Sequence, residues 1–264
     1  MNRHGDKQGS KPGAHAVYEP GAVSDPAIDP DLPDIPRADG SLMSALAFGE
    51  TVGVLYSLAR LVEQRDRHTA GHCERLASSG VALGVAMRLD SASLLSLYVG
   101  GYLHDIGKMG IPDSILFKPG QLTGPEWETM RAHPVLGEEI CRPLKSLGGV
   151  LPLIRHHHER WDGSGYPDGL RGTEIPLLAR VLQTVDIYDA LTNPRPYKHA
   201  YASVRALEIL QEETDRGWRD KEITSLFIRT HKRMLTAIAD SHIGDYGLAG
   251  IGDSLRNLEA LAMY

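Results

Sequence analysis

The stretch LLSLYVGGYLHDIGKMGIPD, residues 94–113, runs from apolar residues directly into an adjacent histidine and aspartate, His104 and Asp105. The apolar part predicts a buried helix, and a charged pair at the end of such a helix is costly unless another charge compensates it. A metal cation would supply that charge, and a carboxylate can bridge two cations. The alternative is a helix C-terminus where His104 and Lys108 meet the last carbonyls. The dipeptide alone does not decide between them.

Further polar residues interrupt the helical pattern where apolar residues are expected. The segment HHHERWDGSGYPDG, residues 156–169, places three consecutive histidines before a glycine-rich loop, and Asp186 interrupts the apolar run ARVLQTVDIYDAL. His72 opens an upstream helix, and His133 lies in MRAHPVLG. Each residue alone is more typical of a surface position or of a hydrogen-bonded core position. Together they favour a metal centre.

The types of these donors narrow the metals and the chemistry. Imidazole and carboxylate without thiolate suit iron, manganese, nickel or zinc. The candidate donors exceed what one ion in such a bundle would use, so we expect two divalent ions that share Asp105. Two ions about 3.5 to 4 Å apart hold a bridging water, lower its pKa to form hydroxide and neutralise a phosphoryl group during in-line attack. The pattern predicts hydrolysis of phosphate esters.

Length and composition predict a soluble globular protein. Of its 264 residues, 42% are hydrophobic, which is enough to bury a core. Cys73 and Cys141 match neither a disulfide framework nor a thiolate zinc site, so we expect a cytoplasmic location. The sequence has neither a membrane-spanning apolar run nor a signal-peptide pattern. The net charge of −6 argues against an extended nucleic-acid surface, so any phosphate has to be bound locally.

The hydrophobic pattern divides the chain into three parts. Residues 1–40 are acidic and proline-rich and predict a disordered tail. Residues 41–240 show helical periodicity without a convincing strand, which predicts an all-α multi-helix bundle that begins with a lead helix over 41–66. Residues 241–264 predict a C-terminal helical extension, which packs on the bundle or alternatively forms a homodimer contact. Further helices are expected at 72–88, 91–107, 125–141, 149–159, 174–191, 202–216 and 220–238.

Two long motifs resemble those of the HD-GYP family, bacterial signalling members of the HD phosphohydrolase superfamily that hydrolyse cyclic di-GMP. The motifs are HDIGKMGIPDSILFKPGQLTGPEWETMRAHPVLG and HHERWDGSGYPDGLRGTEIPLLARVLQTVDIYDALTNPRPYK, and the resemblance runs from about Arg65 to about Lys198. It implies an all-α domain with a Gly-Tyr-Pro loop beside the metal site. It also implies an iron or manganese centre, with nickel and zinc as alternatives, and a phosphodiesterase that forms linear pGpG and then GMP.

The resemblance also implies roles for residues at matching positions. Asp105 and Lys108 would be catalytic, and Lys108 would meet a phosphate oxygen or the leaving oxygen. The spacing of four residues itself predicts that Lys108 lies on the same helix face as His104. Tyr166, Arg195 and Lys198 would contact the substrate together with Lys108. His156 has no counterpart. One metal would be bound by His72, His104, Asp105 and Asp186, and the second by Asp105, His133, His157 and His158.

Several alternatives remain open at this level. The domain could be a weakly active or inactive interaction module that binds diguanylate cyclases (GGDEF proteins) or other signalling proteins, or a phosphodiesterase for another cyclic dinucleotide. His68 stands where family members with three metals have a glutamate, so we expect two metals, with His68 outside the coordination shell. The segment GWRDKEI replaces a usual FDP-like segment, which leaves the packing of the last helices open.

Overall fold

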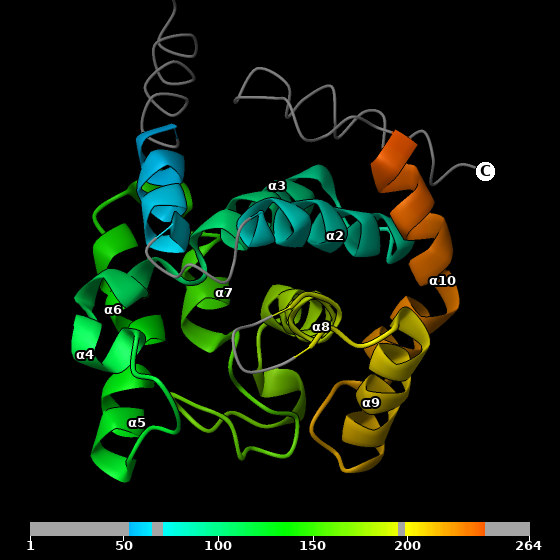
Figure 1. Cartoon of the computed structure of the whole chain (residues 1–264). Coiled ribbons are helices and arrows are strands. Elements are labelled where there is room, and N and C mark those ends of the chain that lie inside the picture. Colours follow the sequence, from blue (N-terminus) through cyan, green and yellow to red (C-terminus); the bar gives the residue numbers. More distant parts are fainter. Residues whose placement is uncertain (1–52, 65–70, 195–198, 241–264) are drawn as a thin grey trace, which may run out of the picture. The chain divides into compact units, whose positions relative to one another are not determined.

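The computed structural model describes residues 53–64, 71–194 and 199–240, and within these ranges every regular element is a helix (Figure 1). The all-α prediction is therefore confirmed. Residues 53–64, the described part of the predicted lead helix, are helical. The predicted tail and the predicted C-terminal extension lie outside the described residues, as do Arg195, Lys198 and His68. No helix among the described residues is both long and apolar enough to cross a membrane.

Long helices alternate with short helical turns along the chain. The 3-10 turns are η1 (Ile106–Gly110), η2 (Lys145–Leu147) and η3 (Gly172–Glu174). The α-helices are α2 (His72–Ala86), α3 (Ser91–Leu103), α4 (Asp113–Leu116), α5 (Gly124–Met130), α6 (His133–Cys141), α7 (Leu151–His156), α8 (Leu177–Thr192), α9 (Ser203–Asp215) and α10 (Lys221–Asp240).

Two of the predicted helices are wrong as continuous elements. The helix expected over 91–107 ends at Leu103, and the chain turns at Asp105 before η1 begins. The helix expected over 125–141 is split into α5 and α6, and Pro134 lies in the first turn of α6. Proline lacks an N–H and clashes with the preceding turn, so it begins a helix more readily than it continues one. Both breaks place candidate donors at helix ends.

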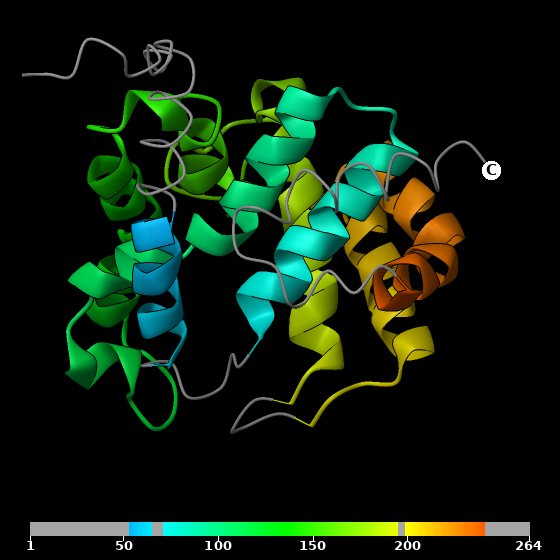
Figure 2. The ribbon, with the colours of Figure 1, turned by 90° about the horizontal axis from the view of Figure 1, so that it is seen from above.

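The helices α2, α3 and α8 form the centre of the bundle. Helices α9 and α10 pack on one side of this centre, and α4 to α6 lie on the other, as both views show (Figures 1 and 2). Apolar side chains such as Leu76, Leu97 and Leu182 join the central helices to α9 and α10. A second apolar cluster joins residues 53–64 to α3, η1, α6 and α7. Burying these side chains supplies the main favourable free energy of folding.

Glycines allow the backbones around the chain turn at Asp105 to approach closely. A Cβ atom at Gly107 would overlap the backbone of His133 and of Gly137 in α6, and one at Gly101 would overlap the backbone of Ala77 in α2. Only glycine lacks the atom that would clash. Gly107 therefore holds η1 directly against the first turn of α6, and this contact brings Asp105 next to His133.

Candidate metal centre

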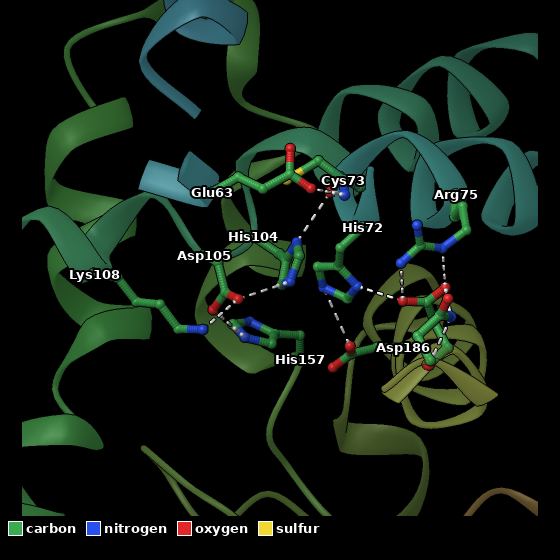
Figure 3. A network of polar contacts seen from close by, with 12 residues as sticks. Glu63, His72, Cys73, Arg75, His104, Asp105, Lys108, His157 and Asp186 are labelled. Carbon is green, nitrogen blue, oxygen red and sulfur yellow. Dashed lines mark hydrogen bonds and ion pairs between the residues drawn. The ribbon is translucent and has the colours of Figure 1, made fainter. Parts of the chain in front are cut away.

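The seven predicted donors lie together in the middle of the bundle, several of them visible in Figure 3. Most of them are at helix ends, where the chain turns away and leaves the side chain facing the centre. They form two adjoining groups, and within each group one donor atom per residue lies within 4.8 Å of the others. The His133 cluster consists of Asp105, His133, His157 and His158, and the His72 cluster consists of His72, His104 and Asp186.

In the His133 cluster, the ring nitrogens converge on one side of Asp105. The Nε2 atom of His133 lies 3.2 Å from Oδ1 of Asp105, and Nε2 of His157 lies 4.0 Å from the same oxygen. The two Nε2 atoms are 3.4 Å apart. The ring of His158 lies beside that of His157, with ring centroids 4.0 Å apart. Nitrogen and oxygen atoms that converge in this way suit a shared divalent cation.

The His72 cluster lies on the other side of Asp105. The Nε2 atom of His72 is 3.6 Å from Oδ1 of Asp186, and Nε2 of His104 is 3.2 Å from Oδ2 of Asp105. Oδ2 also accepts from Nζ of Lys108 at 2.8 Å. Asp105 thus turns one oxygen toward each cluster, which is the arrangement that a bridging carboxylate needs. The resemblance implied the same two groups of residues, with Asp105 shared between them, and metal binding by these residues stays a prediction.

Hydrogen bonds at the opposite ring nitrogen orient three of these histidines. Nδ1 of His104 donates to the carbonyl of Gly101 at 3.0 Å, and Nδ1 of His133 donates to that of Met130 at 2.8 Å. His157 repeats the pattern with the carbonyl of residue 154 at 2.7 Å. A carbonyl can only accept, so Nδ1 carries a proton in each ring, and Nε2 is the atom that offers a lone pair when the ring is neutral. The Nε2 atoms face the clusters.

The protonation states also fit a metal centre. Burial lowers the pKa of His157 and of His158 well below the usual histidine value, and neighbouring histidines lower both further. Burial would raise the pKa of Asp105, but Lys108 and His104 outweigh it and hold that pKa well below its usual range. Burial likewise opposes the charge on His104, yet Asp105 raises the pKa of that ring. Neutral imidazoles and an ionised carboxylate are the forms that bind metal, so His157, His158 and Asp105 are ready to bind, whereas His104 has to release the proton that Asp105 favours.

Cys73 also lines the small space beside His72 and Asp105, together with Glu63 of the lead helix (Figure 3). Burial and then Glu63 raise the pKa of the Cys73 thiol. Because the thiolate is the form that binds metal, a thiol held protonated is a poor ligand. The nitrogen and oxygen atoms of the two clusters therefore remain the candidate donors.

Lys108 faces the centre, but for a different reason from the predicted one. The sequence placed it on the same helix face as His104, one turn later. That reasoning is wrong, because α3 ends before His104 and Lys108 belongs to η1. The chain turn at Asp105 brings the ammonium group back to the Asp105 carboxylate. Lys108 is therefore held beside the metal ligands by an ion pair.

The Gly-Tyr-Pro loop lies against the His133 cluster. The ring of Tyr166 stacks on His158, with centroids 4.8 Å apart, and the Tyr166 amide donates to the His158 carbonyl at 3.3 Å. The guanidinium carbon of Arg131 lies 5.4 Å from the centre of the Tyr166 ring. A Cβ atom at Gly165 would overlap the backbone of Glu159, so the loop can fold back this closely only with glycine there. Tyr166 thus lies at the edge of the centre.

Sequence reasoning missed the residues that hold these elements in place. The fully buried carboxylate of Glu159 accepts hydrogen bonds from three backbone amides of the loop. The donors are the amides of residues 168, 169 and 170, at distances of 2.7, 3.1 and 3.2 Å. The amide of Gln183 donates to the carbonyls of His157, at 3.1 Å, and of Glu159. Asp189 accepts from Nδ1 of His72 at 2.7 Å. The spacing of three residues from Gln183 to Asp186 to Asp189 places them on one helix face, and that signal was available in the sequence.

A third group of potential donors has a structural explanation. His156, Glu159 and Asp168 bring their donor atoms within 4.8 Å of one another. Asp168 is held by the guanidinium of Arg155 at 2.7 and 2.9 Å, and Glu159 binds the loop amides. Nδ1 of His156 lies 3.4 Å from a carboxylate oxygen of Asp168. The group closes the loop, and His156 lies outside both the His133 cluster and the His72 cluster, where the sequence had left it.

The sequence profile of the HD domain family matches residues 56–223. The cyclic di-GMP phosphodiesterase response regulator RpfG of Xanthomonas campestris is 40% identical over 166 residues, which are 61% of this chain and 43% of that protein. The 3'3'-cGAMP-specific phosphodiesterase 3 of Vibrio cholerae is 36% identical, over 60% of this chain and 35% of that protein. A cyclic di-GMP phosphodiesterase of Thermotoga maritima is 36% identical, over 69% of this chain and 50% of that protein. The chain spans half or less of the length of these relatives.

Solved structures share the fold. Bd1817, an HDG"Y"P protein from Bdellovibrio bacteriovorus, matches with a TM-score of 0.51 at 21% identity, over 61% of this chain and 51% of that chain. The cyclic GMP-AMP specific phosphodiesterase V-cGAP3 of V. cholerae matches with a TM-score of 0.58 at 17% identity, over 80% of this chain and 58% of that chain. At these identities the likeness concerns the arrangement of helices.

Proposed function

The chain belongs to the HD domain family, and on that premise we propose that it is a metal-dependent phosphodiesterase that hydrolyses cyclic di-GMP to linear pGpG and then to GMP. The observation that carries the proposal is the position of Asp105, which turns one carboxylate oxygen toward each of two donor clusters. Two adjacent cations joined by a carboxylate are a recurring arrangement in enzymes that cleave phosphate esters.

The relatives support a cyclic dinucleotide as the substrate class. Several are named cyclic di-GMP phosphodiesterases, and others are named 3'3'-cGAMP-specific phosphodiesterases at 36% identity. We take cyclic di-GMP as the first candidate and 3'3'-cGAMP as the second. Both contain guanosine and a ring closed by two phosphodiester linkages, so one phosphate-binding centre serves either.

The two clusters would each hold one divalent ion, with Asp105 shared between them. Iron or manganese is the expected metal, and nickel or zinc also suits imidazole and carboxylate donors. When bound, such ions supply a Lewis acid for the phosphoryl oxygens and an activated water at neutral pH. His157, His158 and Asp105 are held in the protonation states that bind cations, and His104 would release its proton when a cation binds beside Asp105.

The other residues of the site would bind the phosphate and stabilise the leaving group. Lys108 lies beside Asp105, so its ammonium can approach a phosphate oxygen and stabilise negative charge as it develops. Burial and then Asp105 raise the pKa of Tyr166, so its hydroxyl keeps its proton and can donate a hydrogen bond to the substrate. Arg195 and Lys198, which lie outside the described residues, would hold the phosphates of the dinucleotide, with arginine able to make a paired contact.

Product analysis under anaerobic conditions tests the proposal. The chain is purified anaerobically, its metal content is measured, and it is incubated with cyclic di-GMP, 3'3'-cGAMP and cyclic di-AMP. Chromatography should show pGpG and then GMP from cyclic di-GMP, and Lys108→Gln should slow this conversion while keeping the metal. Metal-loaded protein that converts none of the three dinucleotides would contradict the proposal. That result would favour the alternative of an interaction module for GGDEF proteins, with or without dimerisation.

A further inference from the structure

His72 differs from the other oriented histidines of the centre in the partner of its Nδ1 atom. His104, His133 and His157 each donate to a carbonyl three residues earlier in the chain. His72 is the first residue of α2, so α2 itself supplies no earlier carbonyl. Its Nδ1 instead donates to Oδ2 of Asp189 at 2.7 Å, a residue of α8 that lies 117 positions later.

The Asp189 carboxylate is itself held from several directions. Arg75 donates from Nε to Oδ1 at 2.6 Å and from Nη2 to Oδ2 at 3.0 Å, and Asn193 donates to Oδ1 at 2.9 Å. Figure 3 shows His72 and Arg75 pointing toward the same region of α8. Three donor groups on two side chains, in addition to His72, therefore hold the two carboxylate oxygens in fixed positions.

A fixed carboxylate on Nδ1 has two effects on a metal-binding histidine. It holds the proton on Nδ1, so that Nε2 presents its lone pair, and it makes Nε2 a stronger donor than a neutral carbonyl partner would. Nε2 of His72 lies 3.6 Å from Asp186, inside the His72 cluster. In the described part of the chain, His72 is the cluster histidine whose Nδ1 meets a carboxylate.

We propose that Asp189 is a positioning residue that orients His72 and thereby sets the metal affinity of the His72 cluster independently of the His133 cluster. The inference rests on the two-cluster metal centre proposed above. It predicts that the two metal positions respond differently to a change in α8 that leaves every ligand in place.

Asp220 offers a matched control for Asp189. The two aspartates are equally buried, with 8% of their surface exposed. Asp220 also pairs with an arginine, since Nη1 of Arg180 lies 2.6 Å from its Oδ2, and it accepts two backbone amides of α10 at 2.9 and 3.2 Å. These partners belong to neither cluster. Asp220→Asn should therefore perturb the fold about as much as Asp189→Asn does, without touching a metal ligand.

Titration of the metal-free chain with Mn²⁺ tests the role of Asp189 without reference to activity. Wild type, Asp189→Asn and Asp220→Asn are followed by calorimetry and by the electron paramagnetic resonance of free Mn²⁺, and His72→Ala identifies the event that belongs to the His72 cluster. We expect Asp189→Asn to weaken that event by about 10–100-fold, the usual effect of losing a partner of a metal ligand. The second event should keep its affinity, and Asp220→Asn should leave both unchanged.

Two results would overturn the role of Asp189. The first is wild-type affinity at both events in Asp189→Asn, and the second is an equal loss at both events, which would mean a general effect on the fold. Asp189→Glu restores the charge with one more methylene, so we expect it to recover part of the affinity. If Asp189→Asn does not fold, Asp189→Glu is the test. A weaker event at the His72 cluster with an unchanged second event would then support the role of Asp189, and wild-type affinity at both events would overturn it. A wild-type chain that binds no Mn²⁺ would instead contradict the metal centre itself.

Discussion

The two halves of the candidate metal centre are built in different ways. In the His133 cluster, His133 and His157 are oriented by carbonyls of their own neighbourhood, and all members come from the stretch between Asp105 and His158. The His72 cluster is assembled from α2, from the end of α3 and from α8, and its first histidine depends on a hydrogen bond across 117 residues. The His133 cluster forms when neighbouring segments of the chain, η1, α6 and the end of α7, pack together, whereas the His72 cluster forms only when helices distant in the sequence have packed.

The largest effect is expected where the two halves meet. Asp105→Ala removes the carboxylate that faces both clusters, so both should lose metal affinity together. Losing several kcal/mol of electrostatic stabilisation corresponds to a fall in kcat/KM of at least about 10³-fold. Metal analysis and product chromatography measure both effects. Asp215→Ala, at the exposed end of α9, serves as the control, and full activity in Asp105→Ala would contradict the shared role of this residue.

Gly107→Ala should lower the metal affinity of the His133 cluster more than that of the His72 cluster. The added Cβ would collide with the backbone of His133 and push α6 away from η1. Such overpacking costs about 1–3 kcal/mol of unfolding free energy, and each kcal/mol lowers the melting temperature by about 2–4 °C in a chain of this size. We expect the His133 cluster to lose metal affinity more than the His72 cluster, by the Mn²⁺ titration described above.

Gly124→Ala is the control for this change, because a Cβ atom there meets open space. Unchanged melting temperature and unchanged affinities in Gly107→Ala would show that the contact between η1 and α6 does not position the His133 cluster.

The sequence predicted the donors of both clusters better than it predicted what holds them. The donors stand out because histidine and aspartate interrupt apolar helical patterns. Glu159, Gln183 and Asp189 act on atoms of other segments. The three-residue spacing places Gln183 and Asp189 on one helix face with Asp186, but it does not identify the atoms to which they bond. The continuous helix expected over 91–107 fails for a related reason. The turn at Asp105 is set by the contact of Gly107 with α6, which local helix propensity does not encode.

The smallest effect is expected for the loop beside the His133 cluster. Glu159→Gln weakens the contacts to the three loop amides, and hydrogen bonds to a charged group contribute about 1.5–3 kcal/mol. The loop carries Tyr166, so we expect the KM for cyclic di-GMP to rise about tenfold or more, with metal content unchanged. Glu212→Gln is the control, because Glu212 pairs with Arg205 within α9 and does not contact the loop. An unchanged KM in Glu159→Gln would show that the loop does not contribute to substrate binding.

The metal content of the anaerobically purified chain tests the central claim most directly. The account predicts about two ions per chain, as in two-metal phosphodiester chemistry, and about one in each of the variants His72→Ala and His133→Ala. It places His68 outside the coordination shell, so His68→Ala should keep the wild-type value. A single ion in the wild type, a value near three that falls in His68→Ala, or two ions retained in both cluster variants would contradict it.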